Sequence, residues 1–151
     1  MVLKKKSKRL EHVFLGKLIK KGNRARAEKV LFRCLNGLVP QENNASVEKS
    51  NLKYSKIFEE SVEAITPLID LKSKKVSGTF YRIPIYIERR KAMSKGINLL
   101  LEILSARKGV PMEVKLKEEL LLARSGQGKT VGRLQELYES GKKNRGLVKF
   151  L

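Results

Sequence analysis

Several residue types that build chemical sites are scarce in this sequence of 151 residues. Its single cysteine, Cys34, cannot form an internal disulfide, and its single histidine, His12, cannot build a histidine-rich metal site. The single aspartate, Asp70, excludes the paired aspartates that commonly hold magnesium. These shortages favour a reducing compartment and argue against most hydrolytic mechanisms. We therefore predict a protein that is not an enzyme and needs no metal or cofactor.

Tryptophan and long apolar runs are also missing. The longest apolar stretches, around Leu99–Leu104 and Leu120–Ala123, are far too short to cross a bilayer, so no membrane span is expected. Hydrophobic residues nevertheless make up 41% of the chain, enough for the core of one ordinary domain. Cys34 falls on an apolar helical face, where we expect it to pack in that core rather than act as a nucleophile.

Positive charge is what the sequence has in excess. Lysine and arginine total 34 against 15 aspartates and glutamates, which gives a net charge of +19. Such a chain repels itself unless a polyanion neutralises it, and nucleic acid is the commonest such partner. An anionic membrane surface is the other candidate, but it requires basic residues opposite an apolar stripe with tryptophan, phenylalanine and leucine. Here the basic residues are spread over the whole chain, so nucleic acid is favoured.

Apolar residues recur at helical spacing through most of the chain. They predict helices at about 14–19, from the capping residue Asn23 to Pro40, and at about 55–65, 92–107, 112–124 and 130–140. Gln41–Lys53 is polar and rich in turn residues, so it is predicted to be a connection. Gly141 is predicted to end the last helix.

The period changes to two in the middle of the chain. Over Tyr81–Ile87 one alternating set is Tyr81, Ile83, Ile85 and Ile87, with Arg82, Pro84 and Tyr86 between them, as in a β-strand. Ser77-Gly78 fits a hairpin turn after the extended run Ile69–Val76. Pro84 cannot donate to a central ladder, so the hairpin must be an edge or a two-stranded ribbon. The predicted fold is mainly α, with about six helices in a compact bundle and one protruding two-stranded β-hairpin arm.

The chain is predicted to contain one domain with two short extensions. Residues 1–13 form a basic N-terminal arm, residues 14–145 form a single helical RNA-binding domain with the hairpin at about 69–87, and residues 146–151 form a C-terminal tail. Two interpretations of the arm are open: it lies along phosphates, or it is a solvated, disordered tail.

Basic residues gather at the arm, at two turns, on the hairpin and near the C-terminus. We predict RNA contacts from Lys4, Lys5, Lys6, Lys8, Arg9, Lys20, Lys21, Asn23, Arg24, Arg26, Lys72, Lys74, Lys75, Arg82, Arg89, Arg90, Lys91, Lys129, Lys142, Lys143, Asn144 and Arg145. A charged ribbon is often merely solvated, but an isolated two-stranded ribbon is marginal in water, which favours a partner that orders it. Tyr81 and Tyr86 could stack on bases, although hairpin packing is commoner for such residues.

The segment Ala123–Thr130 resembles a phosphate-binding loop, because it ends in Gly-Lys-Thr. That loop requires a buried strand before it, whereas Lys115–Leu122 has the pattern of an amphipathic helix. A helix–loop–helix junction is therefore favoured, with Lys129 touching an RNA phosphate. The carboxylates of Glu113, Glu118 and Glu119 are predicted to form surface ion pairs with Lys115, Lys117 and Arg124 rather than an acid–base site.

With these motifs in order, the chain resembles the universal small-subunit ribosomal protein seven family. The resemblance is carried by Phe14–Ala27, Phe58–Pro67, Leu71–Ile85, Arg89–Ala92 and Asn144-Arg145. Its most specific part is the hairpin, with basic residues before a small-Gly turn and an aromatic-x-x-Pro strand after it. The chain departs from the family at Ser77, where Gly is usual, in its C-terminal ending, which lacks the family's Trp, and in a longer 41–53 connection.

The resemblance implies a structural protein that organises the 3′ major domain of small-subunit rRNA, which forms the head of the subunit. Its neighbours would be other head and platform proteins, with exit-site tRNA and the mRNA exit close to the hairpin. The divergence favours a mitochondrial or other organellar ribosome over the bacterial cytoplasm. Two alternatives stay open: a phosphate-loop nucleotide-binding protein that uses Lys129 and Thr130, and a DNA-binding regulator.

Overall fold

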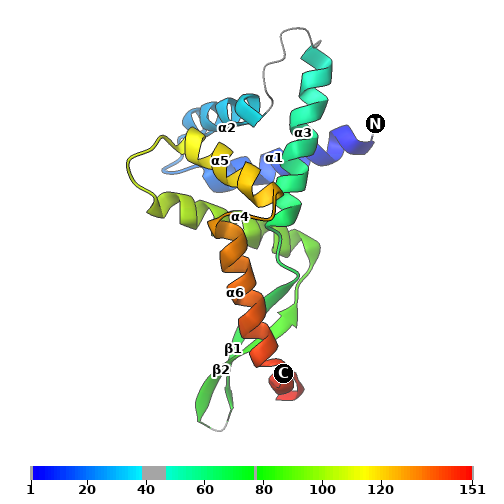
Figure 1. Cartoon of the computed structure of the whole chain (residues 1–151), viewed down its shortest axis with the longest axis vertical. Coiled ribbons are helices and arrows are strands. Elements are labelled where there is room, and N and C mark those ends of the chain that lie inside the picture. The colour runs from blue at the N-terminus through cyan, green and yellow to red at the C-terminus, as the bar shows by residue number, and fades with distance from the viewer. Residues whose placement is uncertain (1, 39–46, 77, 151) are drawn as a thin grey trace.

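A computed structural model describes residues 2–38, 47–76 and 78–150. The elements follow the order α1 (Val2–Leu18), α2 (Arg24–Leu38), α3 (Val47–Ala64), β1 (Ile69–Val76), β2 (Thr79–Tyr86), α4 (Arg89–Ala106), α5 (Met112–Arg124), α6 (Lys129–Lys143) and the 3-10 helix η1 (Arg145–Phe150). Helices α1–α5 form a bundle, and the β1–β2 hairpin projects from it with α6 running alongside (Figure 1). The prediction of a mainly α fold with a hairpin arm is confirmed.

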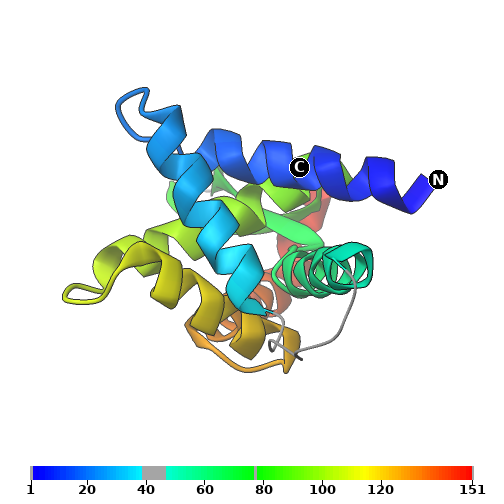
Figure 2. The same ribbon diagram turned by 90° about the horizontal axis from the view of Figure 1, so that it is seen from above.

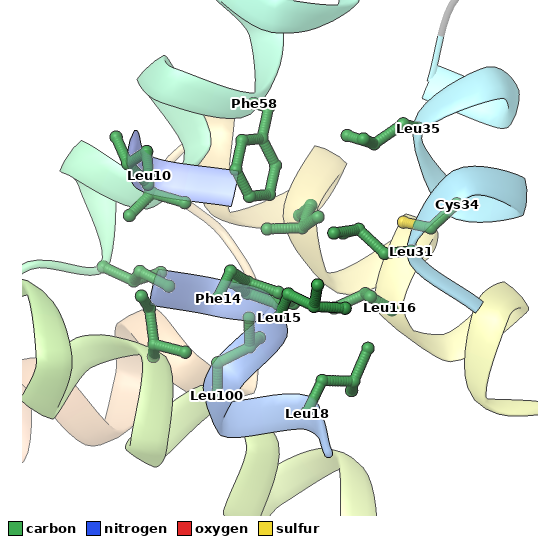
Figure 3. Close-up of a cluster of buried hydrophobic side chains, with 14 of the residues drawn as sticks. Leu10, Phe14, Leu15, Leu18, Leu31, Cys34, Leu35, Phe58, Leu100 and Leu116 are labelled. Carbon is green, nitrogen blue, oxygen red and sulfur yellow. The ribbon is translucent and has the colours of Figure 1, made fainter. Parts of the chain in front are cut away.

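The hydrophobic core lies where α1–α5 meet. Phe14 of α1 and Phe58 of α3 are fully buried and pack edge to face, with ring centroids 5.4 Å apart and an interplanar angle of 76°. Leu31 of α2, Leu100 of α4 and Leu116 of α5 surround this pair (Figure 3). Seen from above, α1 and α2 both pass in front of α4, and α3 is seen nearly end on beside them (Figure 2). Five elements far apart in sequence therefore share one apolar cluster, which fixes the base from which the hairpin projects.

Helix α2 shows the predicted apolar stripe. Its buried residues are Ala27, Leu31, Cys34, Leu35 and Leu38, which follow the spacing of one helical face. The prediction that Cys34 packs in the core is confirmed, because the side chain is 1% exposed.

Cys34 is expected to resist thiol reagents while the protein is folded. Burial raises the pKa of its thiol from 9.0 to about 12, so little of the reactive thiolate is present at neutral pH. The unfolded chain has the ordinary pKa, so above about pH 9 it releases this proton first and the free energy of unfolding falls as the pH rises. A thiol-reagent titration should be slow in buffer and complete in denaturant. Fast reaction in buffer would contradict the buried placement.

Two helices begin at least two turns earlier than the sequence predicted. The helix expected at 14–19 starts at Val2. Leu10 is buried on the same face as Phe14 and Leu18, so the apolar stripe begins one turn before Phe14. Helix α3 starts at Val47, so residues 47–53 of the predicted connection are helical. The remainder of that connection and Ser77 of the predicted turn lie outside the described residues.

The prediction that Gly141 ends the last helix is wrong. Helix α6 continues through Gly141 to Lys143, and Gly141 is buried against the hairpin. A Cβ at this position would lie 2.7 Å from Cδ1 of Ile69 and 3.4 Å from Cβ of Pro84. The glycine therefore lets α6 approach the base of the hairpin closely, so that the two project from the bundle together.

Candidate RNA-binding surface

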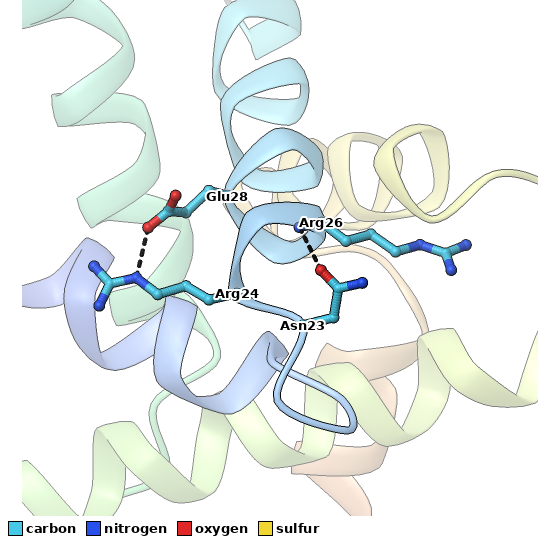
Figure 4. A network of polar contacts seen from close by, with 4 residues as sticks. All are labelled: Asn23, Arg24, Arg26 and Glu28. Atoms are coloured by element: carbon cyan, nitrogen blue, oxygen red, sulfur yellow. Dashed lines mark hydrogen bonds and ion pairs between the residues drawn. The ribbon is translucent and has the colours of Figure 1, made fainter.

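The turn between α1 and α2 is the first basic cluster. Lys21 and Gly22 both adopt left-handed backbone conformations, with φ of +52° and +73°. The side-chain Oδ1 of Asn23 then accepts a hydrogen bond of 3.1 Å from the backbone N–H of Arg26 (Figure 4). This is the N-cap that the sequence predicted, and it satisfies one of the unpaired donors at the start of α2.

The cations of this turn differ in how far they are neutralised. Nε of Arg24 lies 2.7 Å from Oε1 of Glu28, one helical turn away. Arg26 extends to the other side of the helix (Figure 4), and Lys20 and Lys21 are exposed. Within the described residues, no carboxylate pairs with Lys20, Lys21 or Arg26. These three carry the free positive charge of the turn, whereas Asn23 serves as the cap.

The hairpin carries cations on both of its faces. In the antiparallel register Lys75 lies opposite Phe80, Lys74 opposite Tyr81, Ser73 opposite Arg82 and Lys72 opposite Ile83. Residues directly opposite share a face. Lys75 and Arg82 therefore lie on one face and Lys72 and Lys74 on the other. The outer half of the arm presents positive charge in both directions.

Pro84 sits at the free edge of β2, as its missing N–H requires. The carbonyl of Arg82 accepts a hydrogen bond of 2.9 Å from Nδ2 of Asn144, so it points away from β1. Pro84, two residues further on, has the same orientation, and its nitrogen faces away from the ladder. Asn144, predicted to contact RNA, therefore joins the end of α6 to the hairpin, while Arg145 beside it is exposed.

Two ion pairs hold the elements at the base of the hairpin together: one joins β1 to α4, and the other joins α3, which precedes the hairpin, to α4, which follows it. Nζ of Lys95 in α4 donates to Oδ1 of Asp70 in β1, and burial lowers the pKa of the Lys95 ammonium. Nη2 of Arg89 lies 2.6 Å from Oε1 of Glu63 at the end of α3. Arg89, predicted to bind RNA, thus has a carboxylate partner, whereas its neighbours Arg90 and Lys91 are exposed.

The phosphate-loop interpretation is overturned by the junction between α5 and α6. Residues Met112–Arg124 are helical, so no strand precedes Gly128-Lys129-Thr130. Oε1 of buried Glu119 accepts hydrogen bonds of 2.8 Å from both the N–H and the hydroxyl of Thr130. A carboxylate of the protein itself therefore occupies the start of α6, where a bound phosphate would have to lie. The predicted helix–loop–helix junction is confirmed.

The carboxylate cluster of α5 differs from the prediction. Glu113 and Glu118 do form surface ion pairs, but with Arg33 and Arg107, each at 3.1 Å. Glu119 is buried and pairs with no cation of the described residues, so the ion-pair prediction for it is wrong. The sequence could not distinguish these residues, because the partners of Glu119 lie in the following helix.

Replacing Glu119 by alanine is expected to destabilise the free protein by about 2–6 kcal/mol. The change leaves two buried donors of Thr130 without an acceptor, each costing about 1–3 kcal/mol. Denaturant unfolding measures the loss, and Glu118→Ala is the matched control, since that residue is an exposed ion-pair member worth at most about 1 kcal/mol. Equal losses in the two variants would refute the capping role.

Comparison with known proteins decides the family. Residues 2–145 match the family model described as Ribosomal protein S7p/S5e. The chain belongs to this family. Among its relatives, Small ribosomal subunit protein uS7 of Fervidobacterium nodosum is 21% identical over 136 residues, covering 90% of this chain and 83% of the relative. The corresponding protein of Chloroflexus aggregans is 26% identical over 137 residues, covering 91% and 82%.

An organellar relative is similar to the same extent. Small ribosomal subunit protein uS7c of Bigelowiella natans is 23% identical over 143 residues, covering 93% of this chain and 85% of the relative. Membership of the S7p/S5e family confirms the predicted resemblance and makes this chain a ribosomal protein of the small subunit rather than an enzyme. In the part of the chain that the structure describes, no helix is long and apolar enough to span a membrane.

The remaining predicted contact residues of this S7p/S5e family member are spread over the molecule. Helix α1 contains five of them, namely Lys4, Lys5, Lys6, Lys8 and Arg9. Lys129 is exposed at the bundle end of α6, and Lys142 and Lys143 are exposed at the end beside the hairpin (Figure 1). The structure thus brings the hairpin and the end of α6 together, while the α1–α2 turn and Lys129 lie on the bundle.

Proposed function

We propose that this chain binds and organises the 3′ major domain, the head, of small-subunit rRNA. Its place would be near exit-site tRNA and the mRNA exit, among head and platform proteins. The observation that carries the proposal is the arm of the S7p/S5e fold, which projects from the bundle and presents cations on both faces. Beyond its contacts with α6, the ribbon carries exposed cations, and this suits a polyanion that its shape can enter.

The proposed contacts fall into three groups on the described residues. The first is Lys20, Lys21 and Arg26 of the α1–α2 turn, the second is the outer hairpin, and the third is the basic end of α6 with Arg145. Arg24, Arg89 and Asn144 support these groups through their protein partners. Contacts from groups on both the bundle and the arm would hold separate rRNA helices in a fixed relation. The basic residues of the 1–13 segment would add phosphate contacts, and the 146–151 segment is proposed to be a tail beside the arm.

An organellar, mitochondrial ribosome is the proposed compartment. Its support is the low identity, 21% to the relative from Fervidobacterium nodosum, together with the similarity to uS7c of Bigelowiella natans. Fractionation of the source cells tests it. We expect the protein to co-sediment with organellar small subunits. If it sediments only with other ribosomes, the proposed compartment is wrong, but the proposed rRNA binding is unaffected.

A binding titration tests the proposed function. The full chain is titrated against a 3′ major-domain rRNA fragment, an unrelated structured RNA of equal length and duplex DNA, each over a salt series. We expect preference for the rRNA fragment that survives moderate salt, with affinity falling by about 10³–10⁵ between 50 and 200 mM if 6–10 phosphates are contacted. Equal binding to all three would mean that the chain binds nucleic acid only through its overall positive charge. Preference for the duplex DNA would mean that it is a DNA-binding protein.

A further inference from the structure

A groove lies between the base of the hairpin and the end of α6. It has a volume of about 830 Å³ and is lined by Ile69, Pro84 and Tyr86 of the hairpin, by Tyr138 and Lys142 of α6 and by Arg145 of η1, among other residues. This volume falls within the range of about 300–1,000 Å³ that is typical of small-molecule sites. The groove exists because Gly141 lets α6 approach Ile69 and Pro84, while η1 turns back along β2.

The groove combines an apolar floor with one unusually exposed aromatic ring. Ile69 and Pro84 are half-buried, whereas Tyr86 is 92% exposed. The hydroxyl of Tyr138 is already engaged, because it accepts a hydrogen bond of 3.0 Å from the backbone N–H of Leu68. Tyr86 has no such role in the fold, so its ring is free to stack on a planar partner.

The polar residues of the groove are arranged along one face of α6. Gln135 and Glu139 are one helical turn apart, and Lys142 follows at the next turn, close to Arg145. The two cations are exposed and suit a phosphate, since the backbone of a nucleic acid is bound mainly by such side chains. The carboxylate of Glu139 can only accept hydrogen bonds, which suits the exocyclic amino group of a base.

We propose that this groove binds one unpaired nucleotide of the RNA, with its base stacked on Tyr86 and its phosphate on Lys142 and Arg145. The inference rests on the proposed function. It assigns the recognition of a base to this groove, whereas the other basic groups contact only phosphates. Adenine, cytosine and guanine each offer an amino group to Glu139, whereas uracil offers none. The adjacent arm, with Lys75 and Arg82 on the same face as Tyr86, brings the RNA backbone to the groove. This surrounding positive charge favours RNA over a protein segment as the occupant.

The absence of tryptophan from the chain allows a direct test. Tyr86→Trp places a single tryptophan in the groove, and Phe32→Trp, at a 66% exposed position of α2, is the matched control. Each full-length variant is titrated with short oligoadenylate, oligouridylate and an abasic oligomer of equal charge. We expect oligoadenylate to quench the tryptophan at position 86 most strongly and the abasic oligomer to leave it unchanged, with no such difference at position 32.

A second readout uses the 3′ major-domain rRNA fragment. Tyr86→Ala is expected to weaken binding roughly tenfold, while Tyr86→Phe, which keeps the ring, should bind as the parent does. Quenching that does not depend on the base, or unchanged rRNA binding by Tyr86→Ala, would overturn the nucleotide site. If the parent chain still prefers the rRNA fragment in that case, the proposed function stands. If the unsubstituted chain shows no preference for the rRNA fragment, the proposed function itself is wrong.

Discussion

Replacing Lys72, Lys75 and Arg82 together by alanine is expected to lower affinity for the 3′ major-domain rRNA fragment roughly 100-fold. Each side chain projects from the arm without a carboxylate partner among the described residues, and an exposed charge pair is worth about 1 kcal/mol or somewhat less, so three of them account for a loss of this size. The slope of log affinity against log salt should fall by about three, one for each phosphate that the variant no longer neutralises. Titration over a salt series measures both quantities.

The control for this experiment removes the same charge elsewhere. Lys29, Lys56 and Lys108 are exposed on α2, on α3 and before α5. Their joint replacement by alanine lowers the net charge equally, so it reports the contribution of overall charge alone. A loss of affinity as large as that of the hairpin variant would mean that the arm has no special part in binding.

Replacing Phe14 by alanine is expected to lower the free energy of unfolding by about 3–5 kcal/mol, the usual cost of truncating a buried phenylalanine. Phe14 is fully buried and packs edge to face on Phe58, at the centre of the cluster that joins α1 to α3, α4 and α5. The change leaves a cavity where these helices meet. Denaturant unfolding of the RNA-free protein measures the loss.

Phe32→Ala is the matched control for the core variant. It removes the same ring from a position that is 66% exposed on α2, so it should change the free energy of unfolding by about 0.5 kcal/mol or less. A comparable loss in both variants would contradict the placement of Phe14 at the centre of the core.

Local periodicity explains what the sequence could predict about the fold. The stripe of α2, the extent of α5 over Met112–Arg124 and strand β1 over Ile69–Val76 depend on residues near one another in the chain. The burial of Leu10 and of Glu119 and the role of Gly141 depend on contacts with other elements. The sequence pattern cannot reveal such contacts. It therefore predicted Gly141 as a helix end and Glu119 as a surface residue.

The candidate site was predictable in composition but not in detail. Clusters of basic residues are visible in the sequence, and the N-cap at Asn23 follows from the helix that comes after it. The pairing of Arg89 with Glu63 and the bond from Asn144 to β2 join residues far apart in the chain, so no spacing rule could find them. For the same reason the groove beside Tyr86 appears only when α6, η1 and the hairpin are brought together.

Hydroxyl-radical footprinting on complete small-subunit rRNA tests the central claim most directly. The account predicts protection that is concentrated in the 3′ major domain, with part of it missing in the variant that lacks Lys72, Lys75 and Arg82. A decrease confined to one set of nucleotides would locate the arm, while the remaining protection would mark the bundle. Protection spread evenly over the rRNA, or centred in another domain, would contradict the proposal that this protein organises the head.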